Sequence, residues 1–431
     1  VDMQTTQTIA QDPSISVTSV NHVSLDTLGL YDAKQGGMDF KVWQGTNHAR
    51  VKQLLQAQPD VITPRSVRKV LARLLMSVTN PPESENIQQN VLAERVNTLL
   101  ALGETSQAAR LLGQIPDTLM TEKLAQLKFT SHLLSGDDAW VCNNVNDALS
   151  RYESNAPEWQ QLVIYCHANA GRQAEMQLAM NLLEEQQSPL DPALVEAFQL
   201  KSGYLQTASG DVRLEGNVGL LQGAMLALSG LDAYPENYID SAPLPVLELI
   251  ANQETLPEAL RNAAQARIRA LHAGEGNEAV ELAAWLQSQW GDYAQPVGVH
   301  ALAERLFAQS GTTPPADVQK AVRFRIALVA QAMGYGLAVE DVQPWSTTPL
   351  TMPQTLLSPQ ALDLLEQAVA DELEGEALLL MGILAGQAGP LDQWSAETLS
   401  VLVQSLQGLG LEADAKALAS EAVVAQLQAA Q

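Results

Sequence analysis

Two cysteines, Cys142 and Cys166, are the residues whose type and spacing point most directly to chemistry. They are the only cysteines of the 431-residue chain, which is too few for a zinc site, and 24 residues separate them, which excludes a CxxC redox pair. A disulfide between them is the chemistry that remains. The alternative is a pair of buried free thiols, because free cysteine is among the most frequently buried residue types.

The elements around the cysteines favour the disulfide. Residues 140–152 and 157–170 each read as a helix, and the polar turn 153–156 joins them. In an antiparallel hairpin centred on Ser154, the two cysteines lie twelve residues before and after the centre and therefore face each other. Because persistent disulfides belong to oxidising compartments, the bond would place the protein in the periplasm or outside the cell.

The spacing of the histidines predicts neither a metal site on a helix nor a catalytic cysteine–histidine pair. The six histidines include no pair at i, i+3 or i+4. His167 directly follows Cys166, but adjacent residues of a helix point about 100° apart, so the two side chains do not form a thiolate–imidazolium pair. We expect no metal and no cofactor.

Ser66 and Lys69 have the SxxK spacing of penicillin-recognising enzymes, in which serine is the nucleophile. The companion Ser-Asp-Asn and Lys-Thr-Gly motifs do not occur, and neither do Gly-rich phosphate loops or a GxSxG elbow. Neighbouring carboxylates such as Glu184 and Glu185 could suggest a glycosidase pair, but 49 acidic residues produce such pairs by chance. The sequence therefore predicts no catalytic residue.

A basic segment stands out in a very acidic chain. The net charge is −25, yet the stretch 41–73 holds seven basic residues and one acid. Four of the basic residues follow one another on a predicted helix and form a candidate partner-binding face: Arg65, Arg68, Lys69 and Arg73. This face could bind an acidic protein, anionic lipid headgroups or the acidic part of a second copy. The alternative is an ordinary helix face whose charge is balanced within the fold.

Composition excludes several classes of protein. With 46% hydrophobic and 17% charged residues, the chain can build a core and differs from disordered chains. The negative charge argues against nucleic acid as a partner, and 5% aromatic residues argue against a carbohydrate-stacking or base-stacking surface. No uninterrupted apolar stretch reaches the ~20 residues of a membrane span. The seven tryptophans fall mostly on apolar helix positions, which favours core packing.

The periodicity predicts an all-α fold of antiparallel helix pairs stacked as an α-solenoid, in one superhelix or two blocks. Near the N-terminus we expect short turns over 23–38, a helix over 39–56, and a second helix with Thr63 as N-cap and Pro64 at its first position. The expected division is a flexible arm at 1–22, an N-terminal helical segment at 23–86, a helical repeat block at 87–310, a Pro-rich irregular connection at 311–360 and C-terminal helical repeats at 361–431.

Four helix starts share a pattern of glycine, a short polar turn and apolar positions one turn apart. They begin at Gly103, Gly171, Gly274 and Gly410, and their separations are close to multiples of ~34 residues. On this pattern the chain resembles the tetratricopeptide-like α-solenoids, a resemblance that implies a stacked helical fold and a protein-binding role but supplies no catalytic residue.

A second resemblance is carried by the Trp159-x6-Cys166-x4-Gly171 spacing, the run that begins at Pro257 and the closing segment from Gly408. In these stretches the chain is similar to a group of uncharacterised, exported helical proteins of Alphaproteobacteria. This resemblance implies export, and because the chain opens at Val1 we expect an export signal to have been removed before it.

The function that these features favour is a non-enzymatic scaffold or assembly factor in the periplasm, which binds protein partners or further copies of itself and belongs to an envelope machine such as a flagellar motor or secretion system. Association with the envelope as a peripheral protein fits this role. Two alternatives stay open: a cell-wall-acting enzyme that uses the solenoid as a platform, and a periplasmic chaperone or small-ligand binder. An enzyme predicts a deep pocket with a desolvated carboxylate, whereas a scaffold predicts a broad groove.

Overall fold

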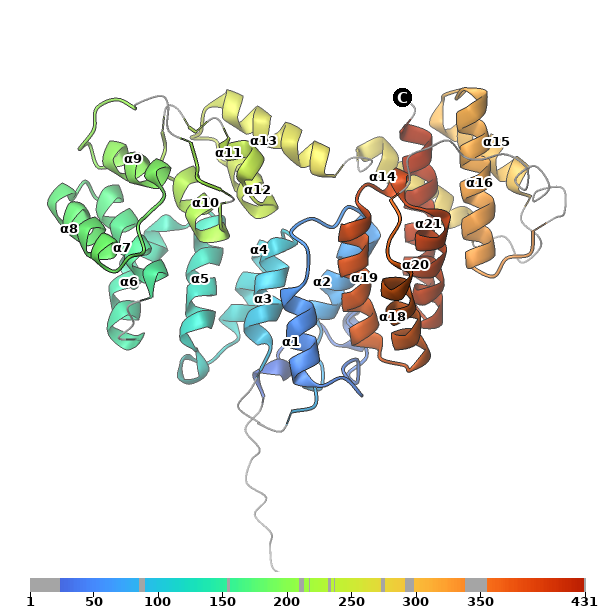
Figure 1. Cartoon of the computed structure of the whole chain (residues 1–431), viewed down its shortest axis with the longest axis horizontal. Coiled ribbons are helices and arrows are strands. Elements are labelled where there is room, and N and C mark those ends of the chain that lie inside the picture. The colour runs from blue at the N-terminus through green and yellow to red at the C-terminus, as the bar shows by residue number, and fades with distance from the viewer. Residues whose placement is uncertain are drawn as a thin grey trace, which may run out of the picture.

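The computed structural model is entirely helical over the part of the chain that it describes, which confirms the predicted all-α class. This part holds twenty α-helices and no strand. It comprises residues 24–84, 90–152, 156–208, 213–216, 218–231, 234–235, 237–272, 276–290, 298–337 and 355–429. The expected arm at 1–22 lies outside the described residues. Figure 1 shows an elongated molecule in which the first helices lie next to the last ones, in the middle of the long axis.

The N-terminal segment begins with the predicted short turns, here the 3-10 helices Leu25–Thr27 and Ala33–Gln35. The helix expected over 39–56 is shorter: α1 spans His48–Gln56, and turns precede it. Asn47 accounts for this start, because its side chain accepts a hydrogen bond from the backbone N–H of Arg50 and caps the helix.

The second helix, α2 (Arg65–Met76), starts one residue later than expected. Pro64, not Thr63, is its N-cap residue, in an extended conformation with φ −69° and ψ 122°. A proline N-cap has no side-chain oxygen to bind the free N–H groups of the first turn. These groups therefore need partners from elsewhere in the fold.

Short helices follow. Their bounds are α3 (Leu92–Ala101), α4 (Thr105–Gly113), α5 (Glu122–Leu134), α6 (Asp138–Tyr152), α7 (Pro157–Asn169), α8 (Gln173–Glu185) and α9 (Pro192–Lys201). Each helix from α3 to α7 contacts the next one, and α9 packs against α7. The expected glycine turns are present at Gly103 and Gly171, and two more occur at Gly136 and Gly203, so the four are 33, 35 and 32 residues apart. Each glycine has a positive φ, which ends one helix and lets the chain reverse. Gly274 lies outside the described residues.

The chain then turns back onto itself, which a simple linear stack does not do. Helix α10 (Leu220–Ala227) packs against α5, and α12 (Leu244–Asn252) packs against α3 and α5. The four-residue helix α11 (Tyr238–Ser241) precedes α12, and α13 (Glu258–Leu271) follows it. Helix α12 begins directly after Pro243, because proline fits the start of a helix as readily as it interrupts one.

The C-terminal helices form a second bundle. Their bounds are α14 (Asn277–Gln289), α15 (Val299–Ser310), α16 (Ala316–Ala332), α18 (Pro359–Ala370), α19 (Glu374–Ala388), α20 (Ala396–Gly408) and α21 (Glu412–Gln428). The irregular connection expected over 311–360 instead contains the 17-residue α16, which starts directly after Pro315. The pair Pro314-Pro315 is thus a helix start, and residues 338–354 lie outside the described part.

Helix α19 is the surface on which the beginning of the chain packs. Three of its glycines face the N-terminal segment so closely that a Cβ atom would lie 2.4 Å from the Trp43 ring at Gly375, 2.5 Å from Leu71 at Gly382 and 2.1 Å from Pro59 at Gly386. Glycine is therefore required at these positions by packing and not by a turn. Helix α2 completes the junction because it contacts α3, α19 and α21.

We predict that Gly386→Ala lowers the free energy of unfolding by about 1–3 kcal/mol, because the new methyl group would overlap the Pro59 ring, which cannot move without shifting the backbone. Gly113→Ala in α4 is the matched control, since no atom lies within 4 Å of its Cβ position and alanine stabilises a helix. Urea unfolding monitored by circular dichroism measures both. A stabilised Gly386→Ala variant would contradict the close packing of the two ends.

The predicted role of tryptophan in the core is confirmed for the described residues. Trp43, Trp159, Trp290 and Trp394 are at most 2% exposed, and Trp140 and Trp285 are partly buried against the core. The remaining tryptophan, Trp345, lies outside the described residues.

Candidate functional site

The predicted cysteine pair is confirmed as a disulfide between two consecutive helices. The Sγ atoms of Cys142 on α6 and Cys166 on α7 are 2.05 Å apart, and the two Cα atoms are 5.3 Å apart. The hairpin helices have the expected positions, α6 over Asp138–Tyr152 and α7 over Pro157–Asn169. The structure describes no other cysteine, so none is free.

Two of the four predicted basic-face residues bind within the protein. Arg73 forms an ion pair with Asp414 on α21, with 2.7 Å between Nη2 and Oδ2. The Arg68 guanidinium donates hydrogen bonds of 2.7 Å to the backbone carbonyls of Ile62 and Thr63, just before α2 begins. The positive charges of Arg68 and Arg73 thus interact with groups of the protein itself.

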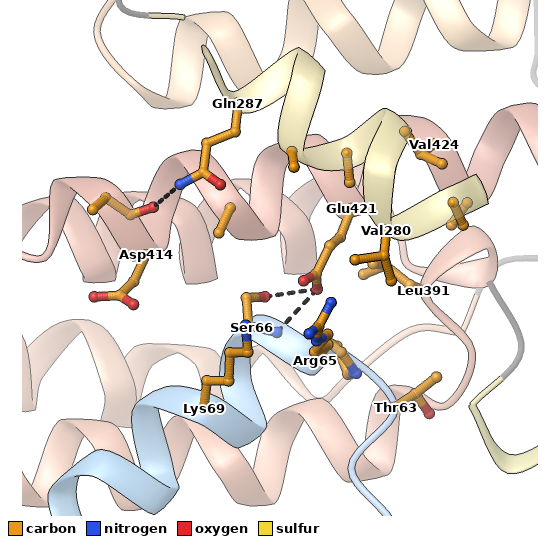
Figure 2. A pocket seen from close by; sticks show the side chains of 17 residues that line it. Thr63, Arg65, Ser66, Lys69, Val280, Gln287, Leu391, Asp414, Glu421 and Val424 are labelled. Carbon is orange, nitrogen blue, oxygen red and sulfur yellow. Dashed lines mark hydrogen bonds between the residues drawn. The ribbon is translucent and has the colours of Figure 1, made fainter. Parts of the chain in front are cut away.

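The other two, Arg65 and Lys69, border a pocket of about 270 Å³ where α2, α14 and α21 meet. Figure 2 shows this junction pocket, with both cationic side chains on the α2 side and Glu421 on the α21 side. Small apolar residues from α14 and α21 make up most of the remaining wall, among them Ala279, Ala283 and Ala417.

Ser66 and Glu421 explain how α2 starts without a side-chain cap of its own. The Glu421 carboxylate accepts hydrogen bonds from the backbone N–H of Ser66, at 3.0 Å, and from its hydroxyl, at 2.9 Å (Figure 2). A carboxylate in this place also interacts favourably with the positive end of the helix dipole. The Ser66 hydroxyl is committed to Glu421 and not to Lys69, so the SxxK spacing describes a structural contact that joins the two ends of the chain.

A larger concave surface lies at the end of the molecule where α8 and α9 are found (Figure 1, left). It is a groove of about 600 Å³ between α8, α9 and residues 205–208. Its apolar lining includes Met180, Leu190, Val195 and Leu205. This α8–α9 groove falls within the range of volumes, roughly 300–1,000 Å³, that is typical of binding sites.

Helix α8 also carries an apolar face that nothing in the described structure covers. Leu178 is 61% exposed and Leu182 is 45% exposed, one helical turn apart. The buried side of the same helix is formed by Met176, Met180 and Leu183. Our sequence interpretation missed this surface, although two leucines outside the buried i, i+4, i+7 stripe are a recognisable pattern.

A pair of carboxylates lies where α12 meets the turn between α3 and α4. Both Glu248 carboxylate oxygens are 3.1 Å from the Cβ position of Gly103, and Glu104 and Arg68 are the charged neighbours. Burial, together with the nearby Glu104 carboxylate, raises the pKa of Glu248 to about 7, and Arg68 opposes the shift. Burial also raises the pKa of Glu104.

This pair predicts a pH-dependent stability. The pKa of Glu248 is about 7 in the folded protein and 4.5 as the ordinary value, so the stability that its protonation contributes is present below pH 4.5 and is lost as the pH rises through about 7. We expect Glu248→Gln to raise the free energy of unfolding at pH 8 by about 1–2 kcal/mol, less than the full shift because the group is partly solvated, and by much less at pH 5. The exposed Glu258 on α13 provides the control variant Glu258→Gln. Equal effects of Glu248→Gln at both pH values would contradict the prediction.

The described part of the chain contains no group of three or more His, Cys, Asp or Glu side chains that could hold a metal ion. None of its helices combines the length and apolarity needed to span a bilayer.

Comparison with known proteins does not identify a family for this chain. No protein-family model, no curated protein and no solved structure matches this chain. The resemblance to tetratricopeptide-like solenoids therefore stays a prediction from the sequence.

Proposed function

We propose that this protein is a non-enzymatic scaffold that binds a partner protein through α8 and the adjoining α8–α9 groove, in an oxidising compartment such as the periplasm. The observation that carries the proposal is the exposed Leu178–Leu182 pair on α8, a helix that also lines a groove of about 600 Å³ with another of its sides. Exposed apolar side chains and concave surfaces are both features of sites that bind another molecule.

The arrangement of charged and polar groups supports a binding role over a catalytic one. The strongly buried charged groups of the described residues bind the backbone and thus hold the fold together: Arg95 and Arg325 donate hydrogen bonds to carbonyls, and Asp26 accepts one from the N–H of Val91. The carboxyl group with a pKa near 7, Glu248, borders a turn and not the groove. The disulfide supports a location in an oxidising compartment, because such bonds persist where the surroundings are oxidising.

The proposal is tested by site-specific photo-crosslinking in the cells that produce the protein. A benzophenone amino acid at position 178 is expected to give a discrete crosslinked product of higher mass, which the second substitution Leu182→Glu weakens. The same amino acid at position 364 is the matched control, because Leu364 is 52% exposed but lies on α18, in the other bundle. Absence of a product at position 178, or the same products at both positions, would refute the proposal.

A further inference from the structure

The junction pocket is formed by helices from distant parts of the chain. Helices α2 and α14 each pack against α21, and the pocket lies where the three meet (Figure 2). Its wall on the α14 and α21 side is made of small apolar residues, among them Ala279, Ala283, Ala417 and Val424. A water molecule occupies roughly 30 Å³ in the liquid, so a pocket of about 270 Å³ has room for about nine non-hydrogen atoms.

Arg65 and Lys69 are the positive charges of this pocket. They are four residues apart on α2, which places them on the same face of the helix. Arg65 is half-buried and Lys69 is exposed. Among the residues that the structure describes, neither side chain has an ion-pair or hydrogen-bond partner.

The two carboxylates that line the pocket already have partners on α2. Asp414 pairs with Arg73, with 2.7 Å between Oδ2 and Nη2. Glu421 accepts hydrogen bonds from the backbone N–H and the hydroxyl of Ser66. The acids of the pocket are therefore engaged in holding the chain ends together, whereas its two cations stay available to a ligand.

We propose that the junction pocket binds a small organic anion, with its carboxylate against Arg65 and Lys69 and with a compact apolar body against the alanines of α14 and α21. The planar guanidinium of arginine suits this ligand, because it donates two parallel hydrogen bonds to a carboxylate. The apolar body is favoured because it leaves water for a wall of methyl groups.

The volume of the pocket separates this ligand from larger anions. A room of about nine non-hydrogen atoms accepts one short carboxylic acid, but only one or two side chains of an acidic protein segment. The site lies at the junction of the two chain ends, away from the Leu178–Leu182 pair on α8. The inference thus goes beyond the scaffold function and does not depend on it.

Three probes of related structure provide the test on the full chain. Octanoate has the charge and the apolar body, octanamide has the same body without the charge, and acetate has the charge without the body. Titrations followed by saturation-transfer difference NMR measure their affinities. Octanoate is expected to bind at least about tenfold more tightly than either of the others, and raising the salt from about 50 to 300 mM should weaken octanoate but not octanamide.

Variants locate the binding. R65Q/K69Q should weaken octanoate about tenfold, to the level of octanamide, and leave octanamide unchanged. The control K34Q/K41Q removes the same charge at two exposed lysines outside the pocket and should leave both affinities unchanged. Ala417→Leu should weaken both probes, because the larger side chain takes up part of the pocket. Circular dichroism checks that each variant is folded.

Four outcomes would overturn the inference. Equal affinity for octanoate and octanamide would reject the anionic ligand, and undiminished binding by Ala417→Leu would reject the pocket. Equal losses in R65Q/K69Q and K34Q/K41Q would show an effect of net charge alone. A peptide of about ten glutamates that displaces octanoate and binds more tightly would replace the small anion with an acidic protein segment. None of these outcomes alters the crosslinking expected at position 178.

Discussion

Replacing Arg95 with methionine should lower the free energy of unfolding by about 3–5 kcal/mol, because the substitution leaves several buried carbonyls without a donor. Arg95 is 1% exposed, and its guanidinium reaches from α3 to two other parts of the chain. It donates hydrogen bonds of 2.7–3.3 Å to the backbone carbonyls of Asp26, Leu28, Leu75 and Ser77. The residue thus joins the first turns of the chain, the end of α2 and α3.

Asp26 provides the companion variant in this experiment. Its carboxylate is 2% exposed and accepts a hydrogen bond of 2.7 Å from the backbone N–H of Val91. Burial raises the pKa of Asp26 and lowers the pKa of Arg95 to about 10, and the attraction between the two opposes both shifts. Asp26→Asn keeps an acceptor for Val91 and should cost only about 1 kcal/mol. Urea denaturation measures both variants, and a loss below about 1 kcal/mol for Arg95→Met would contradict the role of the guanidinium.

Local patterns in the sequence predicted local structure well. The spacing of the cysteines about Ser154, together with Pro157 at a helix start, was enough to predict the hairpin and its disulfide. Both features depend on residues less than 25 positions apart, for which helix geometry leaves few arrangements. The prediction of an irregular connection over 311–360 was wrong for residues 316–332, because the pair Pro314-Pro315 was interpreted as an interruption, whereas it begins α16.

Long-range packing could not be predicted in the same way. The basic residues of α2 were recognised, but Asp414, which pairs with Arg73, lies 341 positions later in the chain. The close contact between Gly386 and Pro59 could not be predicted either. From the sequence alone, a glycine within a helix only lowers the expected stability of that helix, and its packing role appears once the contacting segment is known. The closed junction of the two chain ends is therefore a property of the tertiary structure.

The predicted basic face illustrates how this limit affects the candidate site. On the sequence its four cations form one surface, yet two of them bind within the chain and two border the junction pocket. Binding of an acidic partner by Arg65 and Lys69 stays a prediction. The α8 surface was missed because the elements that cover one side of a helix and leave another side exposed are set by the tertiary structure; Leu178 lies outside the buried side of α8.

Reduction of the Cys142–Cys166 disulfide should lower stability by roughly 3 kcal/mol, the chain-entropy value for closing a loop of 24 residues. The loss should be concentrated at one end of the molecule, because the bond joins α6 to α7 and α8 packs against α7. Amide hydrogen exchange of the oxidised and reduced protein measures this directly. We expect faster exchange in α6 to α8 and little change in α19 and α21, which belong to the other bundle.

The variant C142A/C166A separates the bond from the reducing agent. It should reproduce the exchange pattern of the reduced protein, and dithiothreitol should have no effect on it. Because α8 carries Leu178 and Leu182, the variant should also give less of the crosslinked product at position 178 than the oxidised protein. Unchanged exchange in α6 to α8 after reduction would show that packing alone holds the hairpin, and the disulfide would then have no part in maintaining the binding surface.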